Sequence, residues 1–151
     1  MREILFRGKR KDNGKFVEGY YRYDDIPPFT NEPRTEIVRG GAHRYGYSMI
    51  PYEVIPETVG QYTGLTDKKG KKIFEGDIVK ETYEIFTSER KKEKRTRIGY
   101  VEYSACSFCN GYYAYFWNDK EKWRGNFAIH CGCEVIGNIH DNPELMEEEQ
   151  E

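Results

Sequence analysis

The chain has 151 residues and a net charge of −2, with 24 basic and 26 acidic side chains, and 37% of its residues are hydrophobic. This length fits one domain of ordinary size, or two very small ones. The near balance of charge gives no general argument for a nucleic acid or an anionic membrane as partner. No apolar run approaches the ~20 residues of a membrane span. The N-terminus also lacks the apolar segment of a secretory signal. We therefore expect a cytosolic protein without a membrane partner.

The first part of the chain predicts two β-hairpins. The candidate strands are residues 3–10, 16–21, 36–39 and 43–50. Between the first two lies Asn13-Gly14, a strong hairpin signal because both central residues of a type I′ turn need a positive φ. Between the second two we expect a turn at Gly40-Gly41.

The second part predicts more short strands and one helix. The candidate strands are residues 61–65, 71–74, 78–86, 98–103, 112–117, 127–129 and 133–139. Residues 67–70 read as a turn that ends in a glycine. Near the C-terminus, Asn142 is a good N-cap and Pro143 fits the first helical position, so we expect a short helix from Pro143.

Evenly spaced strands with turn signals between them favour a mostly β fold, with at least seven strands, mostly antiparallel. The expected architecture is a small antiparallel β-barrel, SH3-like or related, with additional hairpins and the short C-terminal helix. We expect a single domain over residues 1–151, built as a hairpin region over residues 1–50 packed on a barrel over residues 51–145. A β-sandwich is the second choice.

Four cysteines raise the question of a zinc site. Cys106 and Cys109 form a CxxC, whereas Cys131 and Cys133 form only a CxC. On a regular strand, a CxC separates its two residues by about 6.6–6.8 Å, which is too far for one tetrahedral zinc unless the backbone bends. We therefore expect thiols that pack as small apolar groups, and no cofactor. A zinc ion held by all four cysteines remains the alternative.

Residues 89–97 form a strongly charged segment with six basic side chains, two acidic ones and no apolar one. We expect a solvated hairpin tip or an extended, mobile arm. A nucleic-acid interface is a second reading, because the aromatic run at residues 112–117 could supply stacking faces. We favour the inert reading, since the whole chain is slightly acidic. The basic residues of the segment are Arg90, Lys91, Lys92, Lys94, Arg95 and Arg97.

The histidines give no sign of catalysis. His43, His130 and His140 lie in no local catalytic pattern. On a strand, His130 would face away from both Cys131 and Cys133, so a base–nucleophile pair is disfavoured there. We expect a protein without enzymatic activity.

Three segments carry a family resemblance. The most specific is residues 54–79, VIPETVGQYTGLTDKKGKKIFEGDIV, and the segments 1–9 and 134–145 agree with it. Together they resemble the YopX family of bacteriophage and prophage proteins. The resemblance implies a mostly β fold with a small barrel, a phage or prophage origin and a bacterial cytoplasmic location. It carries over no catalytic or ligand-binding residue.

These observations lead to one functional hypothesis and two rivals. The hypothesis is a non-enzymatic phage accessory protein, a small β-barrel that binds an unknown host or phage protein. One rival is a nucleic-acid-binding module that uses residues 89–97. The other is a zinc-stabilised β domain. The oligomeric state and the identity of the partner stay open.

Overall fold

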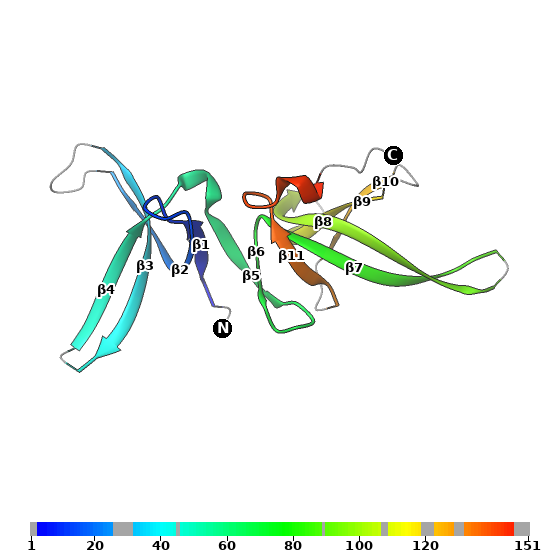
Figure 1. The fold of residues 1–151 in the computed structure, drawn as a ribbon, viewed down its shortest axis with the longest axis horizontal. Helices are drawn as coiled ribbons and strands as arrows, with labels where there is room; N and C mark the ends of the chain where they lie inside the picture. Colours follow the sequence, from blue (N-terminus) through cyan, green and yellow to red (C-terminus); the bar gives the residue numbers. More distant parts are fainter. Residues whose placement is uncertain are drawn as a thin grey trace. The chain divides into compact units, whose positions relative to one another are not determined.

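The computed structural model describes residues 3–25, 32–44, 46–88, 90–106, 109–118, 123–128 and 132–146. Within these residues the chain forms eleven β-strands and two short 3₁₀ turns, so the expectation of a mostly β, antiparallel fold is confirmed. The chain divides into two compact units, Met1–Gly64 and Leu65–Glu151. Figure 1 labels the strands of both.

The first unit is an antiparallel sheet. Its strands are β1 (Phe6–Lys9), β2 (Phe16–Asp24), β3 (Arg34–His43), β4 (Gly46–Glu53) and the start of β5 (Gly60–Thr66). They lie in the order β4-β3-β2-β1-β5, and β4 is the outer strand at one edge. A short 3₁₀ turn, Pro56–Thr58, leads into β5.

The predicted first hairpin is confirmed. β1 pairs with β2 from Phe6↔Gly19 to Lys9↔Phe16. The type I′ turn is not formed: Gly14 has a positive φ of 68° but Asn13 does not, and residues 10–15 join the two strands. The backbone N–H of Lys15 donates to the Asn13 side chain at 3.0 Å.

The second hairpin has its turn elsewhere than expected. β3 runs straight through Gly40 and Gly41, and the turn follows His43, which is the partner of Gly46. Gly46 supplies the positive φ, at 137°. Gly40 and Gly41 therefore lie inside β3, where they pair with residues of β4. Gly46 provides the turn instead.

The core of the first unit lies on one face of its sheet. Val17, Ile37 and Val54 are buried there together, with partly buried hydrophobic residues packed against them: Phe6, Tyr52 and Val59. A Cβ on Gly19 would lie 2.4 Å from the carbonyl oxygen of Val38. β2 and β3 can approach this closely only because residue 19 has no side chain.

The second unit contains a five-stranded sheet. Its strands are β7 (Asp77–Phe86), β8 (Lys92–Cys106), β9 (Cys109–Asn118), β10 (Trp123–Ala128) and β11 (Glu134–Asn138). They lie in the order β10-β9-β8-β7-β11. β6 (Lys72–Phe74) forms a hairpin with β5, so the strand order of the first sheet ends in β1-β5-β6.

The expected closed barrel is wrong. Both sheets are open, since each has two different strands at its ends within the described residues. Turn residues determine which strands become neighbours along the chain, but not whether the last strand pairs with the first. Here β11 pairs with β7 rather than with β10, so the sheet does not close.

The predicted C-terminal helix is also wrong over the described residues. Pro143–Met146 forms a single 3₁₀ turn, in which the N–H of Leu145 donates to the carbonyl of Asn142 at 3.1 Å. The side chain of Asn142 does not act as a helix cap. Instead, its oxygen accepts from the N–H of Asn138 at 3.4 Å and its amide donates to Glu144. No helix among the described residues is long and apolar enough to cross a membrane.

Two buried carboxylates fix the turns of the second unit around its core. Asp67 accepts three backbone N–H groups, from Lys69 at 2.8 Å, Lys71 at 2.9 Å and Val135 at 3.1 Å. Asp77 accepts from the N–H of Phe74 at 2.9 Å. The core cluster beside these turns consists of Ile73, Val79, Val101, Cys133 and Val135.

Candidate interaction surfaces

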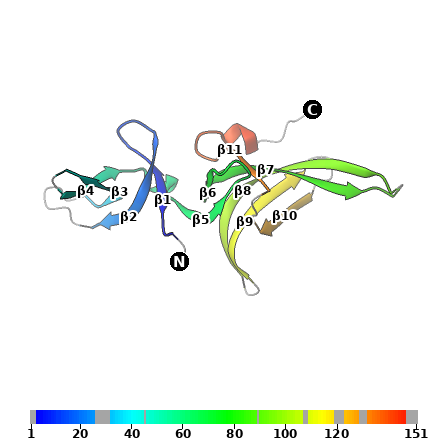
Figure 2. The same ribbon diagram turned by 90° about the horizontal axis from the view of Figure 1, so that it is seen from below.

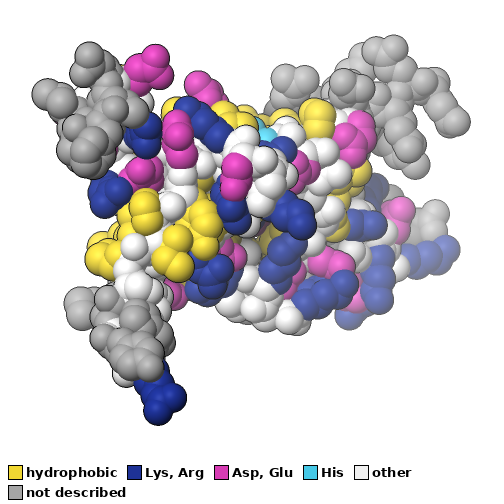
Figure 3. Space-filling view, turned by 60° about the vertical axis from the view of Figure 1, so that its left-hand side comes forward, with side chains coloured by type: hydrophobic (Ala, Val, Ile, Leu, Met, Phe, Trp, Pro, Cys, Tyr) yellow, Lys and Arg dark blue, Asp and Glu magenta, His cyan; other side chains and the backbone are white. Residues whose placement is uncertain are grey.

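Exposed apolar side chains gather on the first unit. In the described part of the chain, half of the ten large hydrophobic residues that are well exposed lie on β2 and β4, namely Tyr20, Tyr21, Tyr23, Met49 and Ile50. In Figure 3, hydrophobic side chains gather on the part of the molecule that comes forward in that view. By the strand register, Tyr20 and Met49 point to one face of the sheet and Tyr21, Tyr23 and Ile50 to the other, with β3 between the two strands.

One face of this sheet carries a continuous apolar row. Tyr20 is opposite Val38, and Val38 is opposite Pro51 across the three strands. Met49 is two residues from Pro51 on β4 and therefore shares its face. Tyr20 and Met49 are 59% and 61% exposed, whereas Val38 on β3, between β2 and β4, is only 3% exposed. We call Tyr20, Val38, Met49 and Pro51 the Tyr20 face.

Ion pairs border the Tyr20 face. Next to Tyr20, Arg22 binds Glu36 on the neighbouring strand through its Nε, 2.8 Å from the carboxylate. Beyond Pro51, Glu53 accepts from Lys11 at 2.6 Å. The charged side chains at the border therefore have partners of opposite sign. An apolar centre with a polar border is the usual anatomy of a protein–protein interface.

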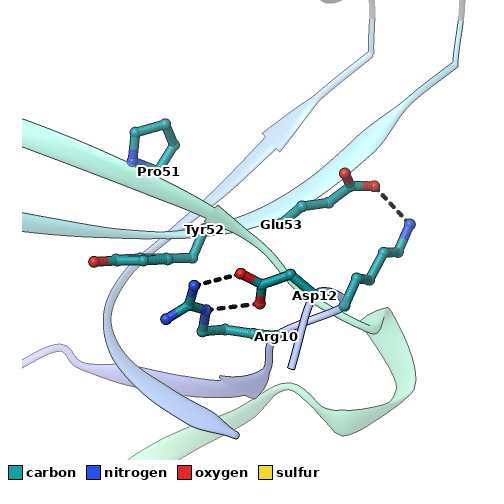
Figure 4. Close-up of a pocket in the computed structure, with 6 residues that line it drawn as sticks. Arg10, Asp12, Pro51, Tyr52 and Glu53 are labelled. Atoms are coloured by element: carbon teal, nitrogen blue, oxygen red, sulfur yellow. Dashed lines mark hydrogen bonds and ion pairs between the residues drawn. The ribbon is translucent and has the colours of Figure 1, made fainter. Parts of the chain in front are cut away.

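An open pocket of about 510 Å³ adjoins this face. Its lining residues are Arg10, Lys11, Asp12, Pro51, Tyr52 and Glu53. Figure 4 shows Arg10 bound to Asp12. Lys11 is bound to Glu53. The Arg10 guanidinium also lies over the Tyr52 ring, 4.4 Å from its centroid, and its hydrogen bond to Asp12 lowers the pKa of that carboxyl. The cations and carboxylates balance within the pocket, so it presents no excess charge to a ligand.

The second candidate surface is a hairpin end in the second unit. β11 pairs with β7 only as far as Lys80, and β9 pairs with β8 only from Ile98 onwards. Residues 81–86 and 92–97 therefore pair only with each other. We call these residues and the turn between them the ribbon. Figures 1 and 2 show it extending past the other strands of its sheet (Figure 1; Figure 2).

The ribbon contains every basic residue that the sequence analysis singled out. Arg90 and Lys91 lie in the turn, and Lys92, Lys94, Arg95 and Arg97 lie on β8. The expected hairpin tip is confirmed, but the segment after residue 91 is a paired strand rather than an unstructured arm. Two of its cations are paired with carboxylates on the opposite strand: Lys92 with Glu84 at 3.3 Å and Arg97 with Glu81 at 2.5 Å.

The cysteines are placed only in part. Cys133 is buried, with 2% of its surface exposed, in the core cluster of the second unit. Cys106 and Cys109 are backbone partners at the end of the β8–β9 hairpin, and Cys131 lies outside the described residues. No three potential metal ligands gather among the residues whose side chains are described. The expectation that the four thiols bind no zinc therefore stays a prediction.

The histidines are likewise incompletely placed. His130 lies outside the described residues, as does the side chain of His43. His140 is half-buried after β11, where its backbone N–H donates to the Asn138 side chain at 2.9 Å. The lining of the pocket beside the Tyr20 face includes no histidine, cysteine or serine.

Sequence reasoning missed the Tyr20 face, although a signal was present. Tyr20, Tyr21 and Tyr23 follow closely on one strand, so their side chains must lie on both faces of it. One sheet face covers the core, hence at least one of these tyrosines had to be exposed.

The comparisons with known proteins agree on the fold. A family model described as YopX protein matches residues 5–147, which confirms the resemblance seen in the sequence. The crystal structure of protein EF1440 from Enterococcus faecalis is similar, with a TM-score of 0.53 and 24% identity. The match covers 97% of this chain and 100% of that one. At this identity the likeness shows the fold alone. Among curated proteins, none matches this chain.

Proposed function

This chain belongs to the YopX family, and on that premise we propose that it is a non-enzymatic accessory protein of a bacteriophage or prophage, which acts in the bacterial cytoplasm by binding a protein partner. The observation that carries the proposal is the Tyr20 face. It offers a partner an apolar row on adjoining strands, bordered by charges that already have partners.

The composition of the Tyr20 face suits a protein partner. Tyrosine and methionine are enriched at the centres of protein interfaces, and tyrosine is common among the residues that contribute most to binding. Burying Tyr20 and Met49 would remove two largely exposed apolar side chains from water. The ion pairs at the border do not have to be broken for this burial, and at the rim of an interface they keep their contact with water.

The pocket supports a non-enzymatic role. An acid or base that catalyses a reaction usually has a pKa shifted towards neutrality. Here Arg10 lowers the pKa of Asp12 below its ordinary value of 3.8, which keeps that carboxyl ionised and bound to the arginine. The pocket is thus lined by exposed ion pairs at the edge of the proposed binding face.

Affinity capture from phage-carrying bacterial cells tests the proposal. The tagged full-length chain is compared with Tyr20→Ser/Met49→Ser and with Tyr103→Ser/Ile4→Ser. The second variant is a matched control, because Tyr103 and Ile4 are 46% and 62% exposed at other places. Mass spectrometry should identify a protein that the wild type and the control retain and that Tyr20→Ser/Met49→Ser loses by about 30-fold, as expected for an interface hot spot. Equal recovery with all three proteins would contradict the proposal.

A further inference from the structure

The strand register separates the charges of the ribbon onto two faces. Residues directly opposite each other in an antiparallel pair point to the same face. Glu81, Tyr83 and Ile85 on β7 therefore share one face with their partners Arg97, Arg95 and Glu93. Thr82, Glu84 and Phe86 share the other face with Thr96, Lys94 and Lys92.

The first of these faces is neutralised internally. Arg97 binds Glu81 at 2.5 Å, and both side chains are largely buried. Arg95 lies 3.7 Å from Glu93 on the same strand. The Arg97 guanidinium also covers the Tyr83 ring, 5.0 Å from its centroid. Two cations and two carboxylates thus balance on this side of the ribbon.

The second face and the turn carry the excess of positive charge. All residues of this face are exposed, and so are Arg90 and Lys91 in the turn. Together, this face and the turn carry four cations, namely Arg90, Lys91, Lys92 and Lys94, and one described carboxylate, Glu84. Glu89 lies outside the described residues. Phe86, 70% exposed, lies at the end of β7 beside these cations, with the Lys92 ammonium 5.8 Å from its ring centroid.

We propose that this face of the ribbon binds double-stranded DNA through the phosphate backbone. The partner follows from charge and from shape. A row of exposed cations attracts a polyanion, since each neutralised phosphate releases counterions. A two-stranded β-ribbon has the width that the major groove of B-DNA admits, whereas the deep and narrow major groove of double-stranded RNA does not admit it. The hydroxyls of Thr82 and Thr96, 3.4 Å apart, add hydrogen-bonding groups for phosphates on the same face.

This inference goes beyond the proposed function, because it uses a surface on the other unit and a different class of partner. Loss of protein capture through the Tyr20 face leaves it intact, and absence of DNA binding leaves the protein partner intact. The two proposals therefore fail separately.

Fluorescence anisotropy with a 20-base-pair duplex of random sequence tests the proposal. The full-length chain should bind with micromolar affinity at 50 mM salt. The logarithm of affinity should fall with the logarithm of salt at a slope of up to about −3.6, about 0.9 for each of four cations. Between 50 and 200 mM salt the affinity should thus decrease by up to roughly 100-fold.

The decisive variant is Arg90→Ser/Lys91→Ser/Lys94→Ser. It leaves the Lys92–Glu84 and Arg97–Glu81 pairs in place, and circular dichroism and the unfolding midpoint check that it folds. It should bind at least tenfold more weakly, and its salt slope should be shallower. The matched control is Lys15→Ser/Arg44→Ser/Lys71→Ser, which removes the same charge from exposed residues away from the ribbon and its strands and should bind like the wild type. A charge-conserving variant, Arg90→Lys/Lys91→Arg/Lys94→Arg, should also keep the affinity.

Other results would overturn the proposal. These are equal weakening by the control variant, undiminished binding by the ribbon variant, no binding at 50 mM salt, and tighter binding to single-stranded DNA, to double-stranded RNA or to vesicles of phosphatidylserine. Each is measured in the same titration with the same protein sample.

Discussion

The Arg97 guanidinium lies 2.5 Å from the Glu81 carboxylate at the base of the ribbon, at the point where β7 and β8 lose their other neighbours. Only 13% and 7% of the two side chains are exposed. Removal of one partner from such a pair leaves a charge that is both buried and unbalanced. Each of the two charges therefore needs the other at the point where the five-stranded sheet becomes the two-stranded ribbon.

The first prediction concerns this pair. Arg97→Met should lower the free energy of unfolding by about 3 kcal/mol, because Glu81 is left buried without its cation. The double variant Glu81→Met/Arg97→Met should recover most of that loss. Lys92→Met, at the exposed pair with Glu84, should change stability by less than about 1 kcal/mol. Urea denaturation measures all three, and an equal effect of Arg97→Met and Lys92→Met would show that the position at the base is unimportant.

The second prediction concerns Asp67, which ties the β5–β6 turn to β11. Asp67→Ala leaves three backbone N–H groups without their acceptor and should cost about 3 kcal/mol in urea denaturation. Asp67→Asn should cost less, since one amide oxygen can still accept from Lys69 and Lys71, while its NH₂ group would face the N–H of Val135. If Asn and Ala are equally destabilising, the tie to β11 is the main contribution.

The same carboxyl adds a dependence on pH. Burial opposes ionisation of Asp67, but the hydrogen bonds from Val135, Lys71 and Lys69 outweigh it and lower the pKa below the ordinary value of 3.8. A group with a lowered folded pKa stabilises fully above its unfolded pKa, and that stability is lost as pH falls through the folded value. Asp67→Asn should therefore unfold with a weaker pH dependence below pH 3.8 than the wild type.

The third prediction concerns Glu134, which two lysines hold on β11. Hydrogen bonds from Lys68 and Lys69, at 2.6 and 2.5 Å, lower the pKa of Glu134 from 4.5 to about 2. Its contribution to stability should be complete above pH 4.5 and should disappear as the pH falls to about 2. Glu134→Gln should lack this component. Because the two lysines are exposed, 1 M salt should reduce the difference between the two proteins, and a difference that grows with salt would be incompatible with an ion pair.

The fourth prediction uses two glycines of the first unit. Gly19→Ala should destabilise by about 1–3 kcal/mol, since its Cβ would meet the Val38 carbonyl oxygen at 2.4 Å and the backbone would have to move. Gly41→Ala is the matched control on the neighbouring strand, where nothing lies within 4 Å of the new Cβ. It should be neutral or slightly stabilising in thermal unfolding. The reverse order would show that the close approach of β2 and β3 is not required.

Local signals in the sequence predicted much of the strand pattern. Gly14 and Gly70 have the positive φ expected in their turns, because glycine adopts this conformation without steric cost, whereas Asn13 does not adopt it and the type I′ turn is not formed. The turn expected at Gly40-Gly41 was wrong, because a glycine can also continue a strand, and these two glycines are paired within β3. The closed barrel failed because closure depends on pairing between distant strands, which no local pattern specifies.

The candidate sites were predictable to different degrees. The charge of residues 90–97 was visible in the sequence, but the sorting of those charges onto two faces depends on the register of Glu81 with Arg97 and of Glu84 with Lys94. The Tyr20 face depends on three strands and on the burial of Val38 between two of them. A sequence shows period-two alternation, but it does not show which face lacks a covering layer.

Site-specific photo-crosslinking in phage-carrying bacteria tests most directly whether the Tyr20 face binds a protein partner. Benzoylphenylalanine replaces Tyr20 in one full-length protein and Tyr103, an exposed tyrosine on β8, in a control. After irradiation, the protein labelled at position 20 should give one discrete covalent adduct with another protein, and the control should not. If position 20 yields no adduct, or if position 103 yields the same adduct with equal efficiency, the Tyr20 face is not the binding surface.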